Sequence, residues 1–397
     1  MKWVDRVVGP ILCIALQPWR VLSRRFGRRG CAGSEVREIL VIKFWGMGSI
    51  VLATPLLAAI RRNYPGARVT VLTFSSNVPI FRAFGIGNRF YDLTIRGPVR
   101  FLFQFVRMVW FLRRGRFDLV FDLEFFTRFT AILAFIAGGQ RSVGYEATHF
   151  WKGNFYGRSA HFNLYRHIVD NFNELGRTAG IEVGKGGLDP MPIPSDVAGK
   201  VAALLREAGL DDRRFVVLNP NAGPLALERR WPAGRFVELA RRIRDEGGLD
   251  VVLVGAPDEE EYVRGIHGEI GRERVHNLAG RLSVPELAAL LARSAALVSS
   301  DSGPLHLATA MRVPTVSLFG PETPVLYGPR GEGHEILFRN LPCSPCMNVY
   351  NAKTVICPYE VRCIREIGAQ EVHERLLRVL ARETAVRSLV AVGSESP

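Results

Sequence analysis

The sequence predicts an α/β fold built from two doubly wound domains that face each other across a cleft. Short apolar segments typical of buried parallel strands alternate with helical segments along the chain. A segment rich in glycine and proline at 185–198 divides this alternation and predicts the linker between domains. With 397 residues the chain is long enough for two domains, which we place at 37–190 and 199–385 after an N-terminal arm at 1–36.

The N-terminal domain begins with a βαβ unit. A strand at 39–43, a glycine loop at 44–49, a helix at 50–62 and a strand at 68–73 make up this unit. The remaining predicted elements are helices at 100–114 and 125–137 and strands at 117–124 and 141–145. Asp122 and Glu124 come at the carboxyl end of their strand, which is where ligands bind in open α/β sheets.

The C-terminal domain repeats the same alternation. The predicted strands are 215–218, 250–255, 275–278, 297–300 and 315–319, and the predicted helices are 233–246 and 283–293. Ser283 and Glu286 form a capping-box pattern at the start of the second helix. Both halves therefore predict a parallel sheet covered by helices.

The segment 297–310 predicts a buried strand that runs through a tight turn into a helix. The turn contains Asp301, Ser302, Gly303, Pro304 and His306. We expect Ser302 to cap the helix through its hydroxyl, Gly303 to allow a ligand close to the backbone, and Pro304 to occupy the first turn. The unpaired N–H groups of such a helix end favour a phosphate, and Asp301 is placed to hold a sugar or ribose hydroxyl. An ordinary capped helix after a strand is the alternative, and both stay open.

The charge distribution indicates an anionic partner. Lys and Arg number 52 against 38 Asp and Glu, a net charge of +14, but no motif that reads DNA or RNA appears, so nucleic acid is disfavoured. The basic excess is strong in residues 1–30, around an apolar run at 7–19 that is shorter than the roughly 20 residues that span a bilayer. We interpret this arm as an anchor on the anionic inner face of the cytoplasmic membrane, with a loose or core-packed helix as the alternative.

For the aromatic segment 100–114, edged by arginines, core packing and a membrane-facing surface both stay open.

Several motifs, taken in order, resemble those of glycosyltransferase family 9, the lipopolysaccharide heptosyltransferases. The motifs are Ile39–Lys43 with Gly46-x-Gly48 and Thr54–Leu57, then Phe117–Leu123, Arg230-Trp231-Pro232, and Asp301–Ala308 with Pro314–Pro321. The resemblance covers about residues 38–380. It implies a GT-B fold, in which two Rossmann-like domains hold a nucleotide sugar mainly through the C-terminal one.

The resemblance also implies an activity. The family transfers a sugar, usually heptose, with inversion, from a nucleotide-diphosphate donor to a lipopolysaccharide or other lipid-linked acceptor, and the chemistry needs no cofactor. The implied donor-binding residues are Asp301, Ser302, Gly303, Pro304, His306, either Arg229 or Arg230, and Glu259 or Asp258 at the ribose. We add Asn221 on the donor side, and Lys43, Gly46 and Gly48 on the acceptor side.

The first glycine loop departs from the family pattern. The family loop normally ends in Gly-Asp, and that aspartate is assigned as the base that deprotonates the acceptor, whereas here the pair is Gly48-Ser49. A serine does not accept this proton at neutral pH without help. Either the base has moved to Glu124 or, less favoured, Asp122, or the substrate brings its own base. The structural alternative is that Asp122 ties down the adjacent loop and that Glu124 is solvated.

A rival function keeps the fold without the chemistry. Because the aspartate is replaced by Ser49, the chain is alternatively a catalytically inactive protein that binds a nucleotide sugar or a glycan. A nucleotide-sugar epimerase is disfavoured, because no paired acid/base histidine motif appears.

Four of the six cysteines gather within 21 residues. They are Cys343, Cys346, Cys357 and Cys363. Four sulfurs at this spacing predict either a structural zinc ion or an iron–sulfur cluster, or, as the alternative, a group of reduced thiols. In a cytoplasmic protein, disulfides are less favoured than a metal.

Overall fold

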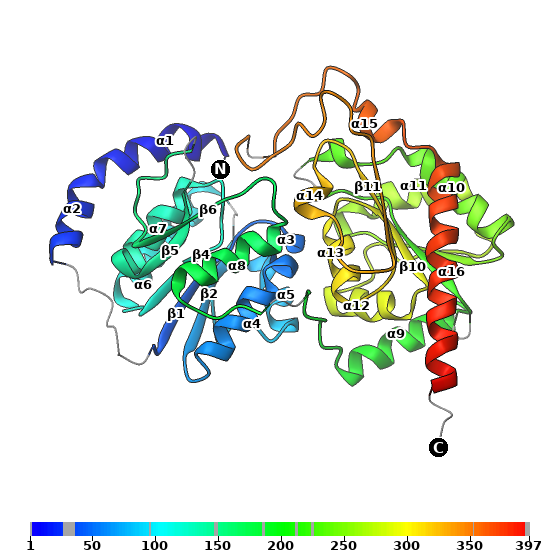
Figure 1. Cartoon of the computed structure of the whole chain (residues 1–397), viewed down its shortest axis with the longest axis horizontal. Coiled ribbons are helices and arrows are strands. Elements are labelled where there is room, and N and C mark those ends of the chain that lie inside the picture. Colours follow the sequence, from blue (N-terminus) through cyan, green and yellow to red (C-terminus); the bar gives the residue numbers. More distant parts are fainter. Residues whose placement is uncertain are drawn as a thin grey trace. The chain divides into compact units, whose positions relative to one another are not determined.

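The computed structural model describes residues 2–26, 36–94, 97–146, 150–184, 187–210, 213–223, 226–351 and 353–393. Part of the predicted arm, with Arg28 and Arg29, lies outside the described residues, as do residues 185 and 186 of the predicted linker. The chain forms two compact units, Met1–Gly186 and Gly187–Pro397, and the boundary between them falls inside the segment 185–198 (Figure 1).

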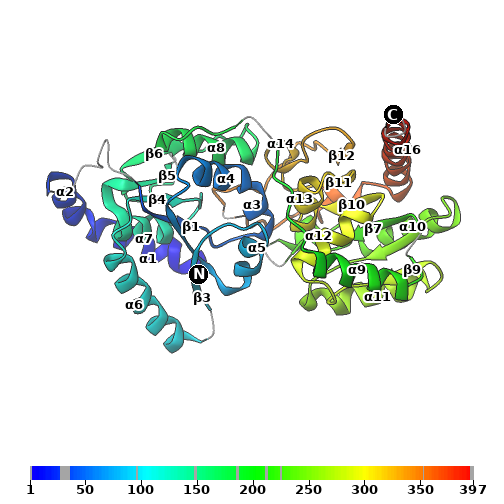
Figure 2. The ribbon, with the colours of Figure 1, turned by 90° about the horizontal axis from the view of Figure 1, so that it is seen from below.

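The N-terminal unit contains a six-stranded sheet in the order β3-β2-β1-β4-β5-β6. Its strands are β1 (Glu38–Ile42), β2 (Arg68–Phe74), β3 (Arg89–Leu93), β4 (Leu119–Asp122), β5 (Ser142–Glu146) and β6 (Arg158–His161). Its helices are α1 (Lys2–Ala15), α2 (Gln17–Phe26), α3 (Met47–Leu52), α4 (Thr54–Asn63), α5 (Val78–Ala83), α6 (Pro98–Arg114), α7 (Arg128–Gly138) and α8 (Ile168–Ala179). α4 and α8 pack together on one face of the sheet, and α6 and α7 on the other (Figure 2).

The C-terminal unit contains a second six-stranded sheet, in the order β12-β11-β10-β7-β8-β9. Its strands are β7 (Phe215–Asn219), β8 (Asp250–Leu253), β9 (Val275–Asn277), β10 (Ala296–Ser300), β11 (Thr315–Phe319) and β12 (His334–Phe338). Its helices are α9 (Ser195–Glu207), α10 (Ala233–Asp245), α11 (Glu260–Ile270), α12 (Val284–Arg293), α13 (Gly303–Ala310), α14 (Pro324–Tyr327), α15 (Arg362–Arg365) and α16 (Ala369–Gly393).

Both sheets have the same topology. All ten strand pairings are parallel, and each sheet, numbered from its own first strand, runs 3-2-1-4-5-6. The strand order reverses between β1 and β4 in one unit and between β7 and β10 in the other, and ligands bind at such a switch point, at the carboxyl ends of the strands. The doubly wound α/β prediction is confirmed. That the two domains face each other across a cleft stays a prediction.

Several elements differ from the predictions for local physical reasons. The predicted helix at 50–62 is divided into α3 and α4 at Ala53, because Pro55 lacks an N–H group and begins a new helix. The helix predicted at 125–137 begins later, at Arg128, where the Thr127 side chain caps it. The edge strands β3 and β6 were not predicted, since their half-exposed residues lack the apolar run of a buried strand.

The N-terminal arm is docked onto the N-terminal unit. α1 packs against α7, and Asp5 accepts hydrogen bonds from the Thr127 hydroxyl (2.9 Å) and from the N–H groups of Phe129 (2.8 Å) and Arg128 (3.2 Å). These N–H groups belong to the first turn of α7 and have no partner within the helix. A carboxylate at this end is further stabilised by the helix dipole. Cys13, two turns along α1, is completely buried. The inner face of the arm is therefore part of the core.

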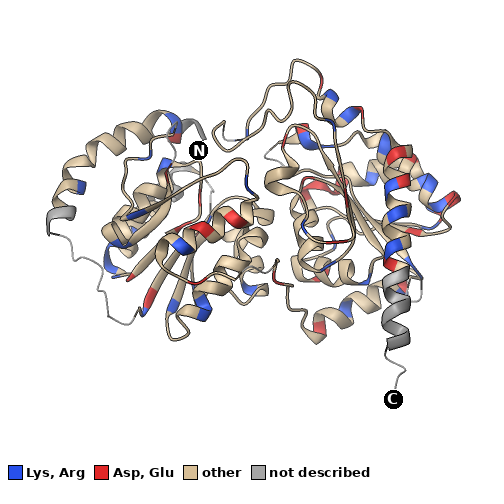
Figure 3. Cartoon of the chain, viewed as in Figure 1, with Lys and Arg blue, Asp and Glu red and all other residues tan. Residues whose placement is uncertain are grey.

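No helix in the described ranges is both long and apolar enough to cross a bilayer. Lysines and arginines lie on both units (Figure 3). The net charge of +14 is therefore not a property of the arm alone.

We expect the Asp5→Ala variant to lower the free energy of unfolding by about 1–2 kcal/mol, because it removes the carboxylate that accepts hydrogen bonds from the first N–H groups of α7 beside the Thr127 cap. Urea or thermal unfolding measures this loss. Asp196→Ala is the matched control, since Asp196 lies in the first turn of α9 without making a cap. Equal losses in the two variants would contradict the capping role of Asp5.

Candidate functional site

Each sheet carries buried polar side chains at the carboxyl ends of the strands beside its switch point. In the C-terminal unit these residues follow β7 and β10, and in the N-terminal unit they follow β1 and β4. The two groups are described separately.

A hydrogen-bond network joins the ends of β7 and β10. The Asn219 amide donates to the hydroxyls of Ser299 and Ser302, at 3.0 Å each, and the two hydroxyls lie 2.8 Å apart. Asn221 donates to the Asn219 side-chain oxygen (3.2 Å) and to the Val254 carbonyl (3.1 Å). Asn221 is buried, and its amide joins the loop after β7 to the residue that follows β8; its predicted place on the donor side stays a prediction.

The prediction that Ser302 caps the following helix through its hydroxyl is wrong. The Ser302 side chain makes no bond to the N–H groups of α13, because its hydroxyl is engaged by Asn219 and Ser299. α13 does begin at Gly303, with Pro304 in its first turn. Without this cap, the partial positive charge at the amino end of α13 is open to an anion.

Asp301 is the centre of the C-terminal group. Arg229 donates to its carboxylate (2.8 Å) and its carbonyl (3.1 Å), and His306 Nε2 lies 3.7 Å from the second carboxylate oxygen. Burial alone would raise the pKa of Asp301, but Arg229, Lys353 and His306 together hold that pKa below its ordinary value. Burial lowers the pKa of His306 to about 4, although Asp301 opposes this. At neutral pH the site therefore holds an ionised carboxylate next to a neutral imidazole.

Lys353 and Glu322 belong to this site and were not predicted. Lys353 Nζ lies 3.0 Å from Glu322 and 3.7 Å from the centre of the Tyr327 ring, and it acts electrostatically on Asp301. The pKa of Glu322 is raised by burial, whereas the surrounding groups overcome burial and raise the pKa of Lys353. The position of Glu322, three residues after the end of β11, was a signal that strand-end reasoning could have used. Lys353 comes from the cysteine-containing loop and gave no such signal.

Arg230 and Glu259 form a neighbouring group near the end of β8. The Arg230 guanidinium lies 4.0 Å from the centre of the Tyr262 ring. Glu259 accepts a hydrogen bond from the Ala256 N–H (2.9 Å), its pKa is raised by burial, and Arg230 partly offsets that rise. Asp258 lies in the same short turn. The ribose role assigned to Glu259 or Asp258 stays a prediction.

In the N-terminal unit, Glu124 holds the first glycine loop. One carboxylate oxygen accepts from Lys43 Nζ (2.8 Å) and from the N–H groups of Phe44 (2.8 Å) and Trp45 (3.1 Å). Glu124 is completely buried and Lys43 is 1% exposed. The structural alternative of a solvated Glu124 is therefore wrong, and Glu124 joins the ends of β1 and β4.

Asp122 is also completely buried, and its hydrogen bonds fix it. Its two oxygens accept from the Tyr156 hydroxyl (2.6 Å) and from the Glu124 N–H (3.0 Å). Burial raises the pKa of Asp122 and lowers that of Lys152, although each group partly offsets the shift of the other. Asp122 thus ties down the segment that carries Glu124.

The glycine loop ends at Ser49, whose hydroxyl is buried. Gly46 precedes α3 with a φ of 82°, a conformation that favours glycine, and Gly48 is buried. Within the described part of the chain, neither the Ser49 hydroxyl nor the second oxygen of Glu124 has a hydrogen-bond partner, and both atoms are buried. The catalytic roles of Ser49, Glu124 and Asp122 and the acceptor-side roles of Lys43, Gly46 and Gly48 stay predictions.

The four clustered cysteines form no disulfide bond in the part of the chain that the structure describes. Cys343 is exposed, Cys346 and Cys357 are half-buried, and Cys363 is buried. Burial and the neighbouring thiols raise the pKa of Cys346, and raise that of Cys363 to about 11. No group of three or more His, Cys, Asp or Glu side chains is placed to hold a metal ion in the ranges that the structure describes. The metal site at these cysteines stays a prediction.

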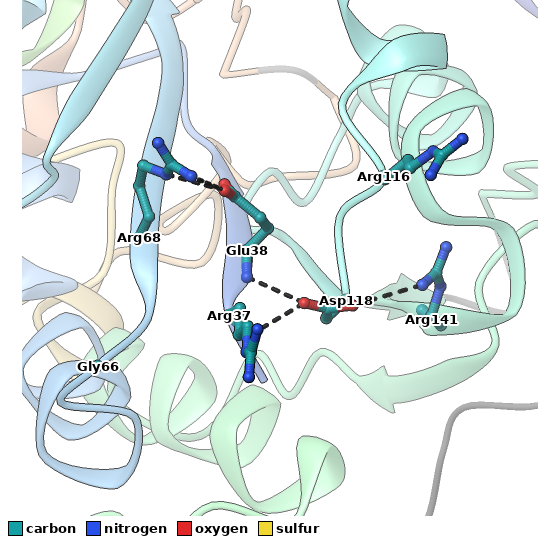
Figure 4. Close-up of a pocket in the computed structure, with 7 residues that line it drawn as sticks. All are labelled: Arg37, Glu38, Gly66, Arg68, Arg116, Asp118 and Arg141. Carbon is teal, nitrogen blue, oxygen red and sulfur yellow. Dashed lines mark hydrogen bonds and ion pairs between the residues drawn. The ribbon is translucent and has the colours of Figure 1, made fainter. Parts of the chain in front are cut away.

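A wide cavity of about 1060 Å³ lies at the opposite edge of the N-terminal sheet (Figure 4). It is lined by Arg37, Glu38, Gly66, Arg68, Arg116, Asp118 and Arg141. Arg68 pairs with Glu38, and Arg141 lies 3.7 Å from Asp118. The cavity surrounds the amino ends of β1 and β4, whereas ligands of such sheets bind at the carboxyl ends. We therefore do not place the site there.

Residues 106–355 match the model of glycosyltransferase family 9 (heptosyltransferase). This is more than half of the chain. The chain belongs to glycosyltransferase family 9. The predicted family and the predicted glycosyltransferase class are thereby confirmed.

Individual relatives of this glycosyltransferase agree with the family match. Lipopolysaccharide heptosyltransferase 3 of Escherichia coli is 24% identical over 302 residues, which cover 71% of this chain and 83% of the relative. The crystal structure of a family 9 glycosyltransferase from Veillonella parvula has a TM-score of 0.70 at 21% identity and covers 88% of this chain and 99% of its own. The structure of the E. coli ADP-heptose lipopolysaccharide heptosyltransferase II has a TM-score of 0.68 at 20% identity and covers 87% and 99%. The two structures show a shared fold.

We expect the stability of this glycosyltransferase to depend on His306 below pH 6.5. The pKa of His306 is about 4 in the folded chain, below its ordinary 6.5, so the unfolded chain binds the additional proton between these values. The contribution of His306 to the free energy of unfolding is therefore complete above pH 6.5. It is lost as the pH falls toward 4, by at most about 1.4 kcal/mol per pH unit. Unfolding of the wild type and of His306→Gln between these pH values measures it. Parallel pH profiles for the two proteins would contradict a neutral, buried His306.

Proposed function

We propose that the enzyme transfers heptose, with inversion, from ADP-heptose to a lipopolysaccharide-type, lipid-linked acceptor at the inner face of the cytoplasmic membrane. The names of the curated relative and of the E. coli structure support the sugar, the nucleotide and the acceptor class. One observation supports the donor site most strongly. The ionised Asp301 lies beside the cations Arg229 and Lys353 and the amino end of α13, at the switch point of the C-terminal sheet.

The donor site needs cations for the two phosphates and a group that accepts hydrogen bonds from sugar or ribose hydroxyls. Arg230 and Lys353, together with the amino end of α13, are suited to the two phosphates, which carry the negative charge of the donor. Arg229 keeps Asp301 ionised and fixed, and an ionised carboxylate accepts hydrogen bonds from sugar or ribose hydroxyls. When the sugar leaves, charge accumulates on the diphosphate, and cations already in position stabilise it without reorganising.

The base that receives the acceptor proton is proposed to be Glu124 rather than Asp122. Both oxygens of Asp122 already accept hydrogen bonds, whereas one Glu124 oxygen has no partner among the described residues. Lys43 pairs with the other Glu124 oxygen at 2.8 Å and so leaves the second oxygen available to an acceptor hydroxyl. The carboxylate is buried, so we infer that the acceptor reaches it when the glycine loop moves.

Substitution of Lys353 tests the proposed phosphate contact. We expect Lys353→Met to weaken ADP binding by about tenfold or more, because a charge-assisted contact to phosphate is lost. Isothermal titration with ADP measures the affinity. Glu322→Gln is the matched control, since it removes the same ion pair but keeps the cation, and should bind ADP as the wild type does. Unchanged affinity in the lysine variant would contradict the phosphate role.

Substitution of Glu124 tests the proposed base. We expect Glu124→Gln to lower kcat at least about a hundredfold while ADP affinity is unchanged, as for loss of a general base. Asp122→Asn should mainly lower the free energy of unfolding. Nucleotide release in the presence of a membrane lipid extract measures the turnover. If Glu124→Gln keeps full turnover, Glu124 is not the base.

Ser49→Asp tests the rival of a catalytically inactive binding protein. This variant restores the residue that the family pattern has at this position. A wild type that binds donor without turnover, and a Ser49→Asp variant that gains turnover, would favour the inactive binding protein. Turnover by the wild type favours the proposed transferase.

The cysteines stand outside the proposed reaction. Metal analysis of the purified chain tests the sequence-based prediction of zinc or an iron–sulfur cluster. About one zinc ion or one cluster per chain, lost together when Cys343 and Cys346 are replaced by serine, would support that prediction. Four titratable thiols without metal would favour the reduced-thiol alternative.

A further inference from the structure

Apolar side chains gather on the outer faces of α1, α2 and α6. More than half of the large apolar side chains that are exposed in the described residues lie on these three helices. The most exposed include Ile11 (62%), Ile14 (63%), Phe103 (64%) and Trp110 (57%). Isolated exposed apolar residues are normal, but a contiguous group of this kind marks an interaction surface.

The inner faces of the same helices are already used. Cys13 of α1 and Met108 and Leu112 of α6 are completely buried. Both helices pack against α7, which is itself buried along most of its length. Their exposed apolar residues therefore belong to a second face that points away from the core. In α6, Phe103, Val106 and Trp110 follow helical spacing and form one stripe.

The three helices are fixed relative to the domain. Asp5 holds the start of α1 on the amino end of α7, and Gln17 of α2 donates to the Gly153 carbonyl (3.0 Å). The Arg113 guanidinium of α6 lies 4.2 Å from the centre of the Trp19 ring of α2. These contacts join the arm to α6, so that the exposed residues of α1, α2 and α6 form one surface.

The charges of this surface have one sign. Arg6, Arg20, Arg107, Arg113 and Arg114 lie on these helices, and their sole acid, Asp5, is occupied at α7. The Arg114 guanidinium stacks 4.1 Å from the Trp110 ring, as Arg113 does on Trp19. Aromatic rings and arginines around an apolar stripe are suited to the boundary between lipid headgroups and acyl chains.

We propose that α1, α2 and α6 form one surface that lies in the interface of an anionic lipid bilayer. The occupant is a bilayer rather than a protein because the apolar residues share their helices with arginines, and the single acid of these helices, Asp5, is bound at α7; this positive charge complements anionic headgroups. The proposal goes beyond the transfer reaction and does not depend on the identity of the donor.

Sedimentation of the full chain with vesicles tests the proposal. We expect binding to phosphatidylcholine vesicles with about 30% phosphatidylglycerol, weaker binding at about 0.5 M NaCl, and little binding to phosphatidylcholine alone. Ile11→Glu with Ile14→Glu should reduce the bound fraction at least about tenfold, and so should Phe103→Glu with Trp110→Glu. Ile356→Glu with Leu377→Glu, on exposed residues of the C-terminal unit, is the matched control and should bind as the wild type does.

Unfolding curves, ADP affinity and the oligomeric state of the chain keep the outcomes distinct. Unfolding curves establish that each variant is folded, and ADP affinity, which should be unchanged in all, separates this surface from the donor site. Full vesicle binding by the α6 variant would overturn the single composite surface. A wild type that binds no vesicles, but whose dimer is converted to a monomer by the same substitutions, would show instead that the surface joins two copies of the chain.

Discussion

In each unit a buried carboxylate is paired with a cation at the carboxyl ends of the strands, and this pairing organises the unit. Asp301 accepts from Arg229, and Glu124 accepts from Lys43, each pair lying beside a switch point. Removing one partner of such a buried pair leaves an uncompensated charge, which costs about 3–5 kcal/mol. Each pair therefore fixes the loops that leave its sheet, and the ligand-binding geometry follows from that fixation.

The two units share a topology but differ in which of their cations are left to contact a ligand. Lys43 donates to Glu124, beside the N–H groups of the loop. Among the described residues of this group, one Glu124 oxygen and the Ser49 hydroxyl have no hydrogen-bond partner. In the C-terminal unit, Arg230 stacks on an aromatic ring and Lys353 comes from a distant loop. The second arrangement is suited to an anionic ligand, and the first to a neutral hydroxyl and its proton.

The sequence was most informative where local pattern decides structure. Buried central strands and the turn at Asp301 were predicted, because an apolar run followed by polar residues is a local signal. The cap at Ser302 was predicted wrongly, since its hydroxyl is taken by Asn219, 83 positions earlier in the chain. Lys353 was missed for the same reason, because its partner Glu322 is brought to it by the fold. Long-range side-chain pairing is what a single sequence does not reveal.

The lipid surface and the candidate base are connected through one short segment. Glu124 lies two residues after β4, and three residues later Thr127 caps α7 and donates a hydrogen bond to Asp5 of the arm. Three residues span at most about 10 Å, so the arm is held close to the glycine loop. If the apolar face of the arm lies in a bilayer, an acceptor anchored by its lipid in the same bilayer is confined to the neighbourhood of that loop. Confinement replaces a search through solution by one within a plane, and it explains why Asp5 fixes the arm instead of leaving it loose.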